Sequence, residues 1–197
     1  MAAAIVEPIA NIFNASIAQG CYPSVWKIGQ VTPLLKKSDE FRKKATGLSQ
    51  SYRILNNIYE RLLVAQLGEK YQAILSDFMG SYRRFYSCDK ALLKLTEDWW
   101  RSMLDKGELF VVVSMDLSKA FDVIQHNLFL AKLKAWCGVG ERSFALFKNY
   151  LSGRQQSVKI ADTFSKWKGI KRGVPQGSVS GSVFRNIFIN DLLGYAR

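Results

Sequence analysis

Residues 110–122 read FVVVSMDLSKAFD, and this stretch decides how the rest of the chain is interpreted. The apolar residues at 110–113 run without a polar break and are mostly β-branched, which favours a strand buried on both faces. The run leads to Asp116, so we expect a carboxylate held rigidly at a strand end, facing a crevice. Divalent cations prefer oxygen ligands of this kind. Asp116 is therefore a candidate metal ligand, although an isolated aspartate after a strand is more often an ordinary surface residue.

The charge of the chain points to a polyanionic partner. Its 197 residues include 28 Lys and Arg against 16 Asp and Glu, for a formal net charge of +12. Such a balance favours nucleic acid first and acidic membrane surfaces second. Basic residues outnumber acidic ones in two clusters, at 27–53 and 154–172. Either cluster alone is typical of a solvated face, but together they flank the candidate metal ligand.

Cysteine and histidine usage argues against zinc and against a disulfide framework. Cys21, Cys88 and Cys137 are odd in number and far apart, and the single histidine is His126. A reducing compartment suits this pattern. No stretch approaches the roughly 20 apolar residues that span a bilayer, and the N-terminus lacks the features of a signal peptide. We expect an intracellular protein, nuclear or cytoplasmic, without a membrane partner.

Hydrophobic periodicity predicts several helices. Helices are expected at 5–17, closed by Gly20, and at 127–136, 141–151 and 183–193. Another helix should begin with an Asn57–Glu60 capping box, and its apolar stripe is Ile58, Leu62, Leu63 and Leu67. A further helix is expected at 87–106, capped by Ser87, and the side chains facing the core are Leu92, Leu95, Trp99 and Met103. Residues 156–160 and 164–173 alternate apolar and polar positions and predict a β-hairpin. Residues 38–52 are polar and predict a loop. Mixed helices and strands indicate an α+β fold.

Residues 79–89, MGSYRRFYSCD, place Arg83 and a second arginine among aromatic residues. Arginine interleaved with aromatics suits phosphate contact combined with stacking on a base or sugar. A loop anchored by its aromatics, with its arginines in water, explains the segment equally well.

Two motifs resemble reverse transcriptases, and most closely the polymerase of non-LTR (LINE-type) retrotransposons. They are DLSKAFD at 116–122 and GVPQGS at 173–178, and the segments at 23–40, 51–53, 91–99 and 184–191 agree with them. The resemblance implies a right-hand polymerase with a central antiparallel sheet and flanking helices. It divides the chain into an N-terminal extension at 1–45, fingers at 46–107, and a partial palm with a second, fingers-side hairpin at 108–197.

The resemblance also implies roles for individual residues. Asp116, with the carbonyl of Leu117, resembles the first ligand of the catalytic Mg²⁺ ions, and Phe121 resembles the gate that packs under the nucleotide sugar. Arg53 and Arg83 resemble the fingers arginines that meet the triphosphate. The loop that shapes the template–nucleotide pocket is matched by Gly173, Pro175, Gln176 and Gly177. The implied partners are an RNA template, a DNA primer and deoxynucleoside triphosphates.

Departures from the family pattern limit the expected activity. The family carries a YADD-type hairpin after the second motif, and no adjacent pair of aspartates occurs in the 197 residues. We expect a fragment truncated before that hairpin, inactive alone, with doubtful Mg²⁺ binding. Arg185 also stands among apolar residues of the last predicted helix, as an unpaired charge on a core face.

Two other functions stay open on the sequence. One is a remnant that binds RNA or an RNA–DNA hybrid without chemistry. The other, ranked last, is an interaction protein with Trp99, Trp100 and Trp136 as anchors.

Overall fold

The chain is described by a computed structural model. The described residues are 2–35, 46–51, 54–83, 85–105, 107, 111, 113–114, 119–175 and 177–194.

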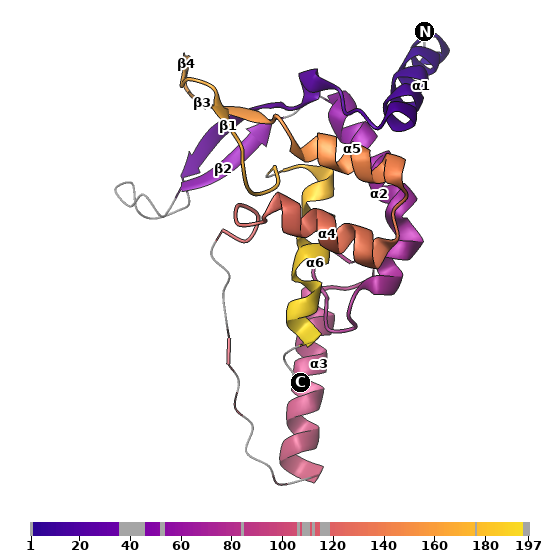
Figure 1. The fold of residues 1–197 in the computed structure, drawn as a ribbon. Coiled ribbons are helices and arrows are strands. Elements are labelled where there is room, and N and C mark those ends of the chain that lie inside the picture. Colours follow the sequence, from indigo (N-terminus) through magenta and orange to yellow (C-terminus); the bar gives the residue numbers. More distant parts are fainter. Residues whose placement is uncertain are drawn as a thin grey trace.

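A small mixed sheet lies to one side of a body of helices (Figure 1). In it, β1 (Ile28–Leu35) pairs antiparallel with β2 (Thr46–Ser51) and parallel with β3 (Gln155–Ile160). Strand β3 also pairs antiparallel with β4 (Thr163–Phe164) and with β5 (Lys168–Gly169). The expectation of a sheet with flanking helices is confirmed, and so is the basic hairpin. The expectation of an antiparallel sheet is wrong at the β1–β3 pair, because β1 comes from a distant segment and runs in the same direction as β3.

Strand β2 corrects the prediction of a loop at 38–52. Its sequence, TGLSQS, carries almost no apolar pattern, yet it pairs with β1 from Thr46 opposite Leu35 to Ser51 opposite Gln30. Backbone hydrogen bonds of an antiparallel ladder do not depend on side-chain type. A polar segment therefore becomes a strand when a neighbouring strand offers its free edge.

Six α-helices belong to the described part of the chain. They are α1 (Ala2–Gln19), α2 (Ile54–Ile74), α3 (Cys88–Trp100), α4 (His126–Cys137), α5 (Glu141–Leu151) and α6 (Val179–Ile189). Short helical turns at Arg101–Asp105 and Asn190–Gly194 continue α3 and α6, and a third turn at Ser24–Trp26 precedes β1. Helices α2, α4, α5 and α6 contact one another and form the body, and α1 packs on α5. Helix α3 projects away from this body (Figure 1).

The predictions for α4 and α5 are confirmed to within a residue at each end. Gly138 ends α4 in the left-handed conformation, with φ +54°, a backbone state that glycine adopts without strain. Ser87 caps α3 as expected, because its side chain accepts a hydrogen bond from the backbone N–H of Lys90.

Helices α1, α2 and α6 start at least three residues earlier than predicted, α1 at Ala2. Helix α2 begins at Ile54, so Asn57 and Glu60 lie inside it and form no capping box. Helix α6 begins at Val179, where Ser178 caps it by accepting from the N–H of Gly181. The predicted stripe of α2 is also only partly buried: Leu63 and Leu67 face the core, whereas Ile58 and Leu62 are exposed. Buried hydrogen bonds of Asn56 and Glu60 decide which face of α2 turns inward.

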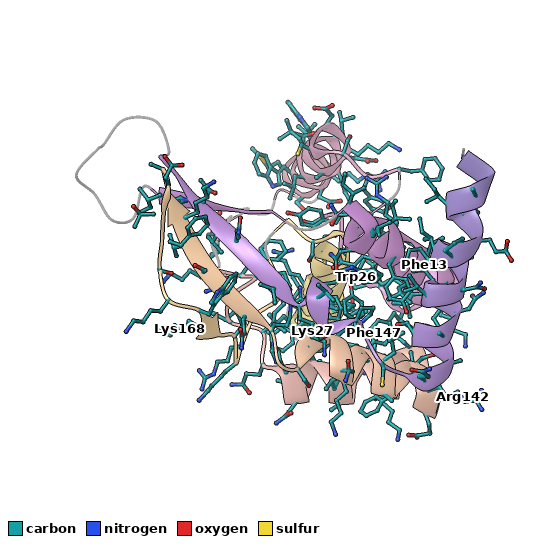
Figure 2. The ribbon with its side chains drawn as sticks, turned by 90° about the horizontal axis from the view of Figure 1, so that it is seen from above. Phe13, Trp26, Lys27, Arg142, Phe147 and Lys168 are labelled. Carbon is teal, nitrogen blue, oxygen red and sulfur yellow. The ribbon has the colours of Figure 1, made fainter. Side chains whose placement is uncertain are left out.

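The core is rich in aromatic side chains from the helices and the turn before β1. Phe13 stacks on Tyr59 with ring centroids 4.7 Å apart, and Tyr22 meets Tyr150 edge-on at 4.8 Å. Offset or edge-to-face pairs add about 0.5–1.5 kcal/mol each beyond the burial of their area. Figure 2 shows Phe13, Trp26 and Phe147 within the body, while Arg142 and Lys168 point outward. This core makes the helical body the rigid support of the site.

The predicted buried strand at 110–113 is not found in the described residues. Val111 and Val113 belong to no strand and are 81% and 77% exposed. A strand needs a partner to satisfy its backbone groups, and no described strand pairs with this segment. The prediction that one face of α3 packs on the core is wrong at three of its four positions. Leu92, Leu95 and Met103 are exposed, whereas Trp99 is half-buried.

Candidate functional site

The segment after Asp116 and the glycine loop at 173–178 lie against each other, although fifty residues of sequence separate them. The N–H of Gly173 donates to the carbonyl of Ile124 at 2.8 Å, and the N–H of Val174 donates to the carbonyl of Phe121 at 2.9 Å. Val174 and Ile124 are both buried at this junction. These backbone bonds hold Phe121 in a fixed position beside the loop.

Gly173 permits this close approach. A Cβ on Gly173 would lie 2.8 Å from the Cα of Asp122 and 2.9 Å from the carbonyl oxygen of Phe121. Its φ of +82° is also one that other residues rarely adopt. Further along, Ser178 donates from its hydroxyl to the carbonyl of Pro175 at 2.7 Å before it caps α6. The loop is therefore fixed at both ends, by Phe121 on one side and by α6 on the other.

The half-buried ring of Phe121 has two further neighbours from distant segments. The ring of Tyr82 meets it edge-on with centroids 6.3 Å apart, and the guanidinium carbon of Arg185 lies 5.9 Å from its centroid. A cation over an aromatic face at this distance is attracted by the ring quadrupole. Arg185 therefore has an aromatic partner, and the expectation of an unpaired charge on a core face is corrected.

Asn186 of α6 and Asn190, which directly follows α6, attach the Tyr82 loop and the end of α2 to this site. The side-chain amide of Asn186 donates to the carbonyl of Ser81 at 2.6 Å and to the hydroxyl of Tyr71 at 3.0 Å. Asn190 bonds the carbonyl of Ile74 and the N–H of Ser76, both at 2.8 Å. Burial raises the pKa of Tyr71, and the bond from Asn186 partly opposes that shift. The sequence signal that could have indicated this contact is the i, i+4 spacing of the two asparagines.

A buried polar cluster supports the start of α6 from behind. Glu60 is fully buried, and its Oε1 accepts from the amide of Asn56 and from the hydroxyl of Tyr150, each at 3.0 Å. Its Oε2 accepts from the N–H and the hydroxyl of Ser180, both at 3.2 Å. The hydroxyl of Tyr22 donates to Asn56 at 2.6 Å, and burial is the main cause that raises the pKa of Tyr22. Protein donors thus take the place of water at both oxygens of the Glu60 carboxylate. These hydrogen bonds fix α6 against α2.

Arg83 lies next to Tyr82 in the chain, but its guanidinium is directed to the end of α2. Nε donates to Gln72 at 3.1 Å and a terminal nitrogen donates to the carbonyl of Ser76 at 3.2 Å. Its guanidinium also stacks on Tyr86 at 4.8 Å. Arg83 is therefore held within the protein while Tyr82, Phe85 and Tyr86 are exposed, so a loop anchored by its aromatics, with its arginines in water, does not describe Arg83.

The structure thus brings together part of the predicted site. Phe121, Gly173, Pro175 and the start of α6 converge, and Gly177 follows in the same loop with φ +80°. Asp116, Leu117, Arg53 and Gln176 lie outside the described residues. Sequence reasoning missed Asn186, Asn190 and the Glu60 cluster.

Within the described ranges, no three His, Cys, Asp or Glu side chains gather closely enough to hold a metal ion. None of the helices in those ranges is both long and apolar enough to cross a membrane.

The arrangement suits a ligand that has both a flat ring or sugar and an anionic part. Phe121 offers a half-buried aromatic surface, Tyr82 offers an exposed one, and Arg185 supplies a positive charge. Stacking with charge-assisted hydrogen bonds is how nucleotides are commonly held.

Comparison with known sequences gives a consistent answer. The chain matches the family described as reverse transcriptase (RNA-dependent DNA polymerase) over residues 34–197. It is 27% identical over 192 residues to a probable RNA-directed DNA polymerase from transposon BS of Drosophila melanogaster, covering 93% of this chain and 20% of that protein. It is also 27% identical to the RNA-directed DNA polymerase from mobile element jockey of Drosophila funebris, covering 92% and 20%.

A third relative is the retrovirus-related Pol polyprotein from type-1 retrotransposable element R1 of Bradysia coprophila. It is 27% identical over 198 residues, which cover 96% of this chain and 18% of that protein. The chain therefore spans about a fifth of the length of the curated relatives it matches.

Proposed function

The chain belongs to the reverse transcriptase family, as its motifs predicted, and from that premise we propose that it carries the nucleotide-binding part of a retrotransposon RNA-directed DNA polymerase. In this proposal, Phe121 packs under the sugar of the incoming deoxynucleotide. The loop of Gly173, Pro175, Gln176 and Gly177 lies against the base pair formed with the template. The fingers at 46–107 and the partial palm at 108–197 supply the surrounding walls.

One observation supports the proposal most strongly. The two motifs that define the family meet through backbone hydrogen bonds from Gly173 and Val174 to Ile124 and Phe121. A polymerase needs a rigid wall beside the sugar, because a ribose hydroxyl is rejected only where its space is firmly filled. Phosphoryl transfer itself depends on positioning and on neutralising charge rather than on covalent help from protein.

The metal requirement limits what the chain does alone. Mg²⁺ ions would polarise the transferred phosphate and neutralise its charge, and Asp116 with the carbonyl of Leu117 are the residues we propose to contact them. A two-metal site needs several shared carboxylates, and no adjacent aspartate pair occurs in the 197 residues. We therefore propose that the chain binds a primed RNA template and a deoxynucleotide but does not join them.

Primer extension on an RNA template with Mg²⁺ or Mn²⁺ tests this proposal. We expect the chain to retard the primed template in a gel at low salt, because its net charge of +12 favours phosphate contacts. We expect nucleotide incorporation no greater than that of the Asp116→Ala variant. Absence of any complex with the primed template would contradict the polymerase assignment, whereas incorporation above that of Asp116→Ala would contradict the inactivity alone.

A second function is a remnant that holds RNA or an RNA–DNA hybrid and has lost the nucleotide site. The basic clusters at 27–53 and 154–172 favour it, because they require no carboxylate. The two functions differ in nucleotide binding, which such a remnant would lack.

A further inference from the structure

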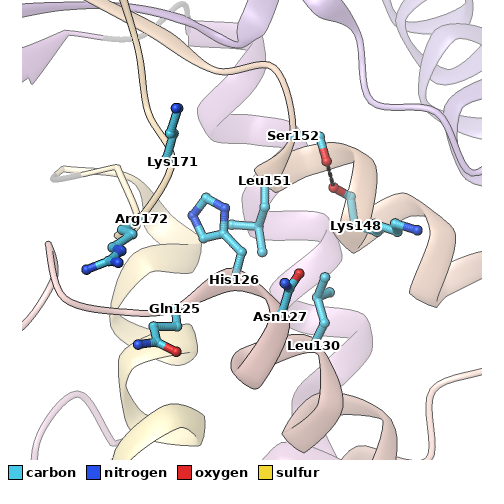
Figure 3. A pocket seen from close by; sticks show the side chains of 9 residues that line it. All are labelled: Gln125, His126, Asn127, Leu130, Lys148, Leu151, Ser152, Lys171 and Arg172. Carbon is cyan, nitrogen blue, oxygen red and sulfur yellow. Dashed lines mark hydrogen bonds between the residues drawn. The ribbon is translucent and has the colours of Figure 1, made fainter.

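A pocket of about 380 Å³ opens next to the residues that lead into the glycine loop (Figure 3). It lies between the start of α4, the end of α5 and the two residues that precede Gly173. Its polar lining includes Lys148, Lys171, Arg172, His126, Asn127 and Ser152. None of the family motifs at 116–122 and 173–178 contributes to it. The pocket is therefore distinct from the proposed nucleotide site, although the two adjoin the same loop.

The charge of the pocket is entirely positive. Three cationic side chains, Lys148, Lys171 and Arg172, line it, and no lining residue carries a carboxylate. None of the three forms an ion pair with a residue that the structure describes. Cationic side chains around a pocket that has no carboxylate give it a positive potential. That potential favours an anionic ligand.

His126 links the pocket to the glycine loop. Its Nε2 lies 2.8 Å from the carbonyl oxygen of Gly173. Because a carbonyl oxygen only accepts, Nε2 carries the hydrogen and donates it. The imidazole thus stands between the pocket and the loop, and a ligand in the pocket would contact the group that holds the Gly173 carbonyl.

The surroundings favour a polymeric anion over a free ion. The basic side chains continue from Arg172 through Lys171 and Lys168 to Lys166, and no acidic residue interrupts residues 163–172. All four side chains are exposed, as a strand passing along the surface would require. Pockets for small organic groups measure about 300–1,000 Å³, so this one admits a phosphate together with its sugar.

We propose that this pocket binds a phosphodiester of a single nucleic-acid strand, and that the strand continues along the basic hairpin. This inference rests on the proposed function, which brings such a strand to the glycine loop. Template RNA and single-stranded DNA share the chemistry, and the experiment separates them. The interaction would couple strand binding to the position of Gly173 through His126.

The single histidine of the chain provides a specific reporter. Titration with a short oligouridylate, with the matching oligothymidylate and with inorganic phosphate is followed by the one imidazole C2–H resonance in the NMR spectrum. We expect a saturable shift with at least one oligonucleotide, and the stronger binder identifies the strand as RNA or DNA. Binding of an oligonucleotide without any movement of this resonance would overturn the proposal. A shift that inorganic phosphate causes and neither oligonucleotide causes would also overturn it.

A pair of charge-matched variants gives the second readout. Lys148→Gln/Lys171→Gln is expected to weaken oligonucleotide binding about tenfold and to reduce the slope of log affinity against log salt by about 0.7 per lost contact. Lys70→Gln/Lys94→Gln removes the same charge from exposed positions outside the pocket and is expected to retain nearly full affinity. Equal losses in both variants would overturn the pocket, while leaving the polymerase assignment intact if the primed template still binds. Failure of the unaltered chain to bind any strand would overturn both.

Discussion

Gly173→Ala is expected to lower the free energy of unfolding by about 3 kcal/mol and the melting temperature by about 10 °C. The new Cβ would meet backbone atoms of Phe121 and Asp122 at 2.8–2.9 Å, and backbone cannot rotate away as a side chain can. Alanine at φ +82° adds further strain. The hydrogen bonds from Gly173 and Val174 hold these same residues, so relief of the clash would separate the two motifs. Thermal denaturation followed by circular dichroism measures the effect.

Gly153→Ala is the matched control for this variant. Gly153 has a similar φ of +67°, but a Cβ there would meet nothing within 4 Å. Gly153→Ala should therefore lower the free energy of unfolding only by the backbone strain, about 1 kcal/mol. Equal destabilisation by the two substitutions would show that the close approach of the motifs contributes no stability.

Glu60→Leu is expected to destabilise the protein by about 4 kcal/mol. The substitution removes both acceptor oxygens and leaves the amide of Asn56, the hydroxyl of Tyr150 and the N–H of Ser180 buried near an apolar side chain. An unpartnered buried donor costs about 1–3 kcal/mol. Because Ser180 lies in the first turn of α6, loss of these bonds should also loosen the glycine loop that precedes it. Urea denaturation gives the free energy.

The comparison variant for Glu60 is Glu97→Leu on α3. Glu97 is exposed and, among the described residues, forms its ion pair with Arg101 one turn away, and such surface pairs contribute about 0–1 kcal/mol. We expect the urea midpoint of the Glu97→Leu protein to stay close to that of the unaltered chain. A Glu60→Leu protein as stable as the Glu97→Leu protein would refute the structural role of the buried cluster.

Periodicity and capping residues were sufficient to predict much of the helical body. Helices α4 and α5 follow their apolar spacing between glycines, and Ser87 marks the start of α3. These signals are local, so one segment of sequence contains them. The start of α2 was misplaced because Glu60, which looks like half of a capping box, is used by Tyr150 and Ser180 instead.

Features that depend on a distant partner could not be predicted. Strand β2 forms because β1 offers it an edge, and its own residues carry no strand pattern. The valines at 111 and 113 have the opposite character, since their pattern favours a strand but no described strand pairs with them. Side-chain identity alone does not reveal which backbone edges are available.

In the candidate site too, local motifs could be predicted from the sequence, whereas contacts with distant residues could not. The motifs around Phe121 and Gly173 were recognised in the sequence, and the structure describes them as neighbours. The contact of Arg185 with Phe121 and the bonds of Asn186 to Ser81 and Tyr71 depend on how α6 packs. In the sequence Arg185 stands out only as an unpaired charge and Asn186 carries no signal of its own, so the partners of both residues depend on the packing.

The central claim is that Phe121 and the glycine loop form one wall of a deoxynucleotide pocket. Equilibrium binding of dATP and ATP in the presence of Mg²⁺, to the unaltered chain and to Phe121→Val, tests it most directly. Phe164→Val on β4 is the control, because it shortens an exposed phenylalanine outside the site. We expect the unaltered chain and Phe164→Val to bind dATP about tenfold more tightly than ATP, a difference of about 1.4 kcal/mol, and Phe121→Val to bind both nucleotides with equal affinity. Equal affinities in the unaltered chain, or a preference for dATP that survives in Phe121→Val, would contradict it.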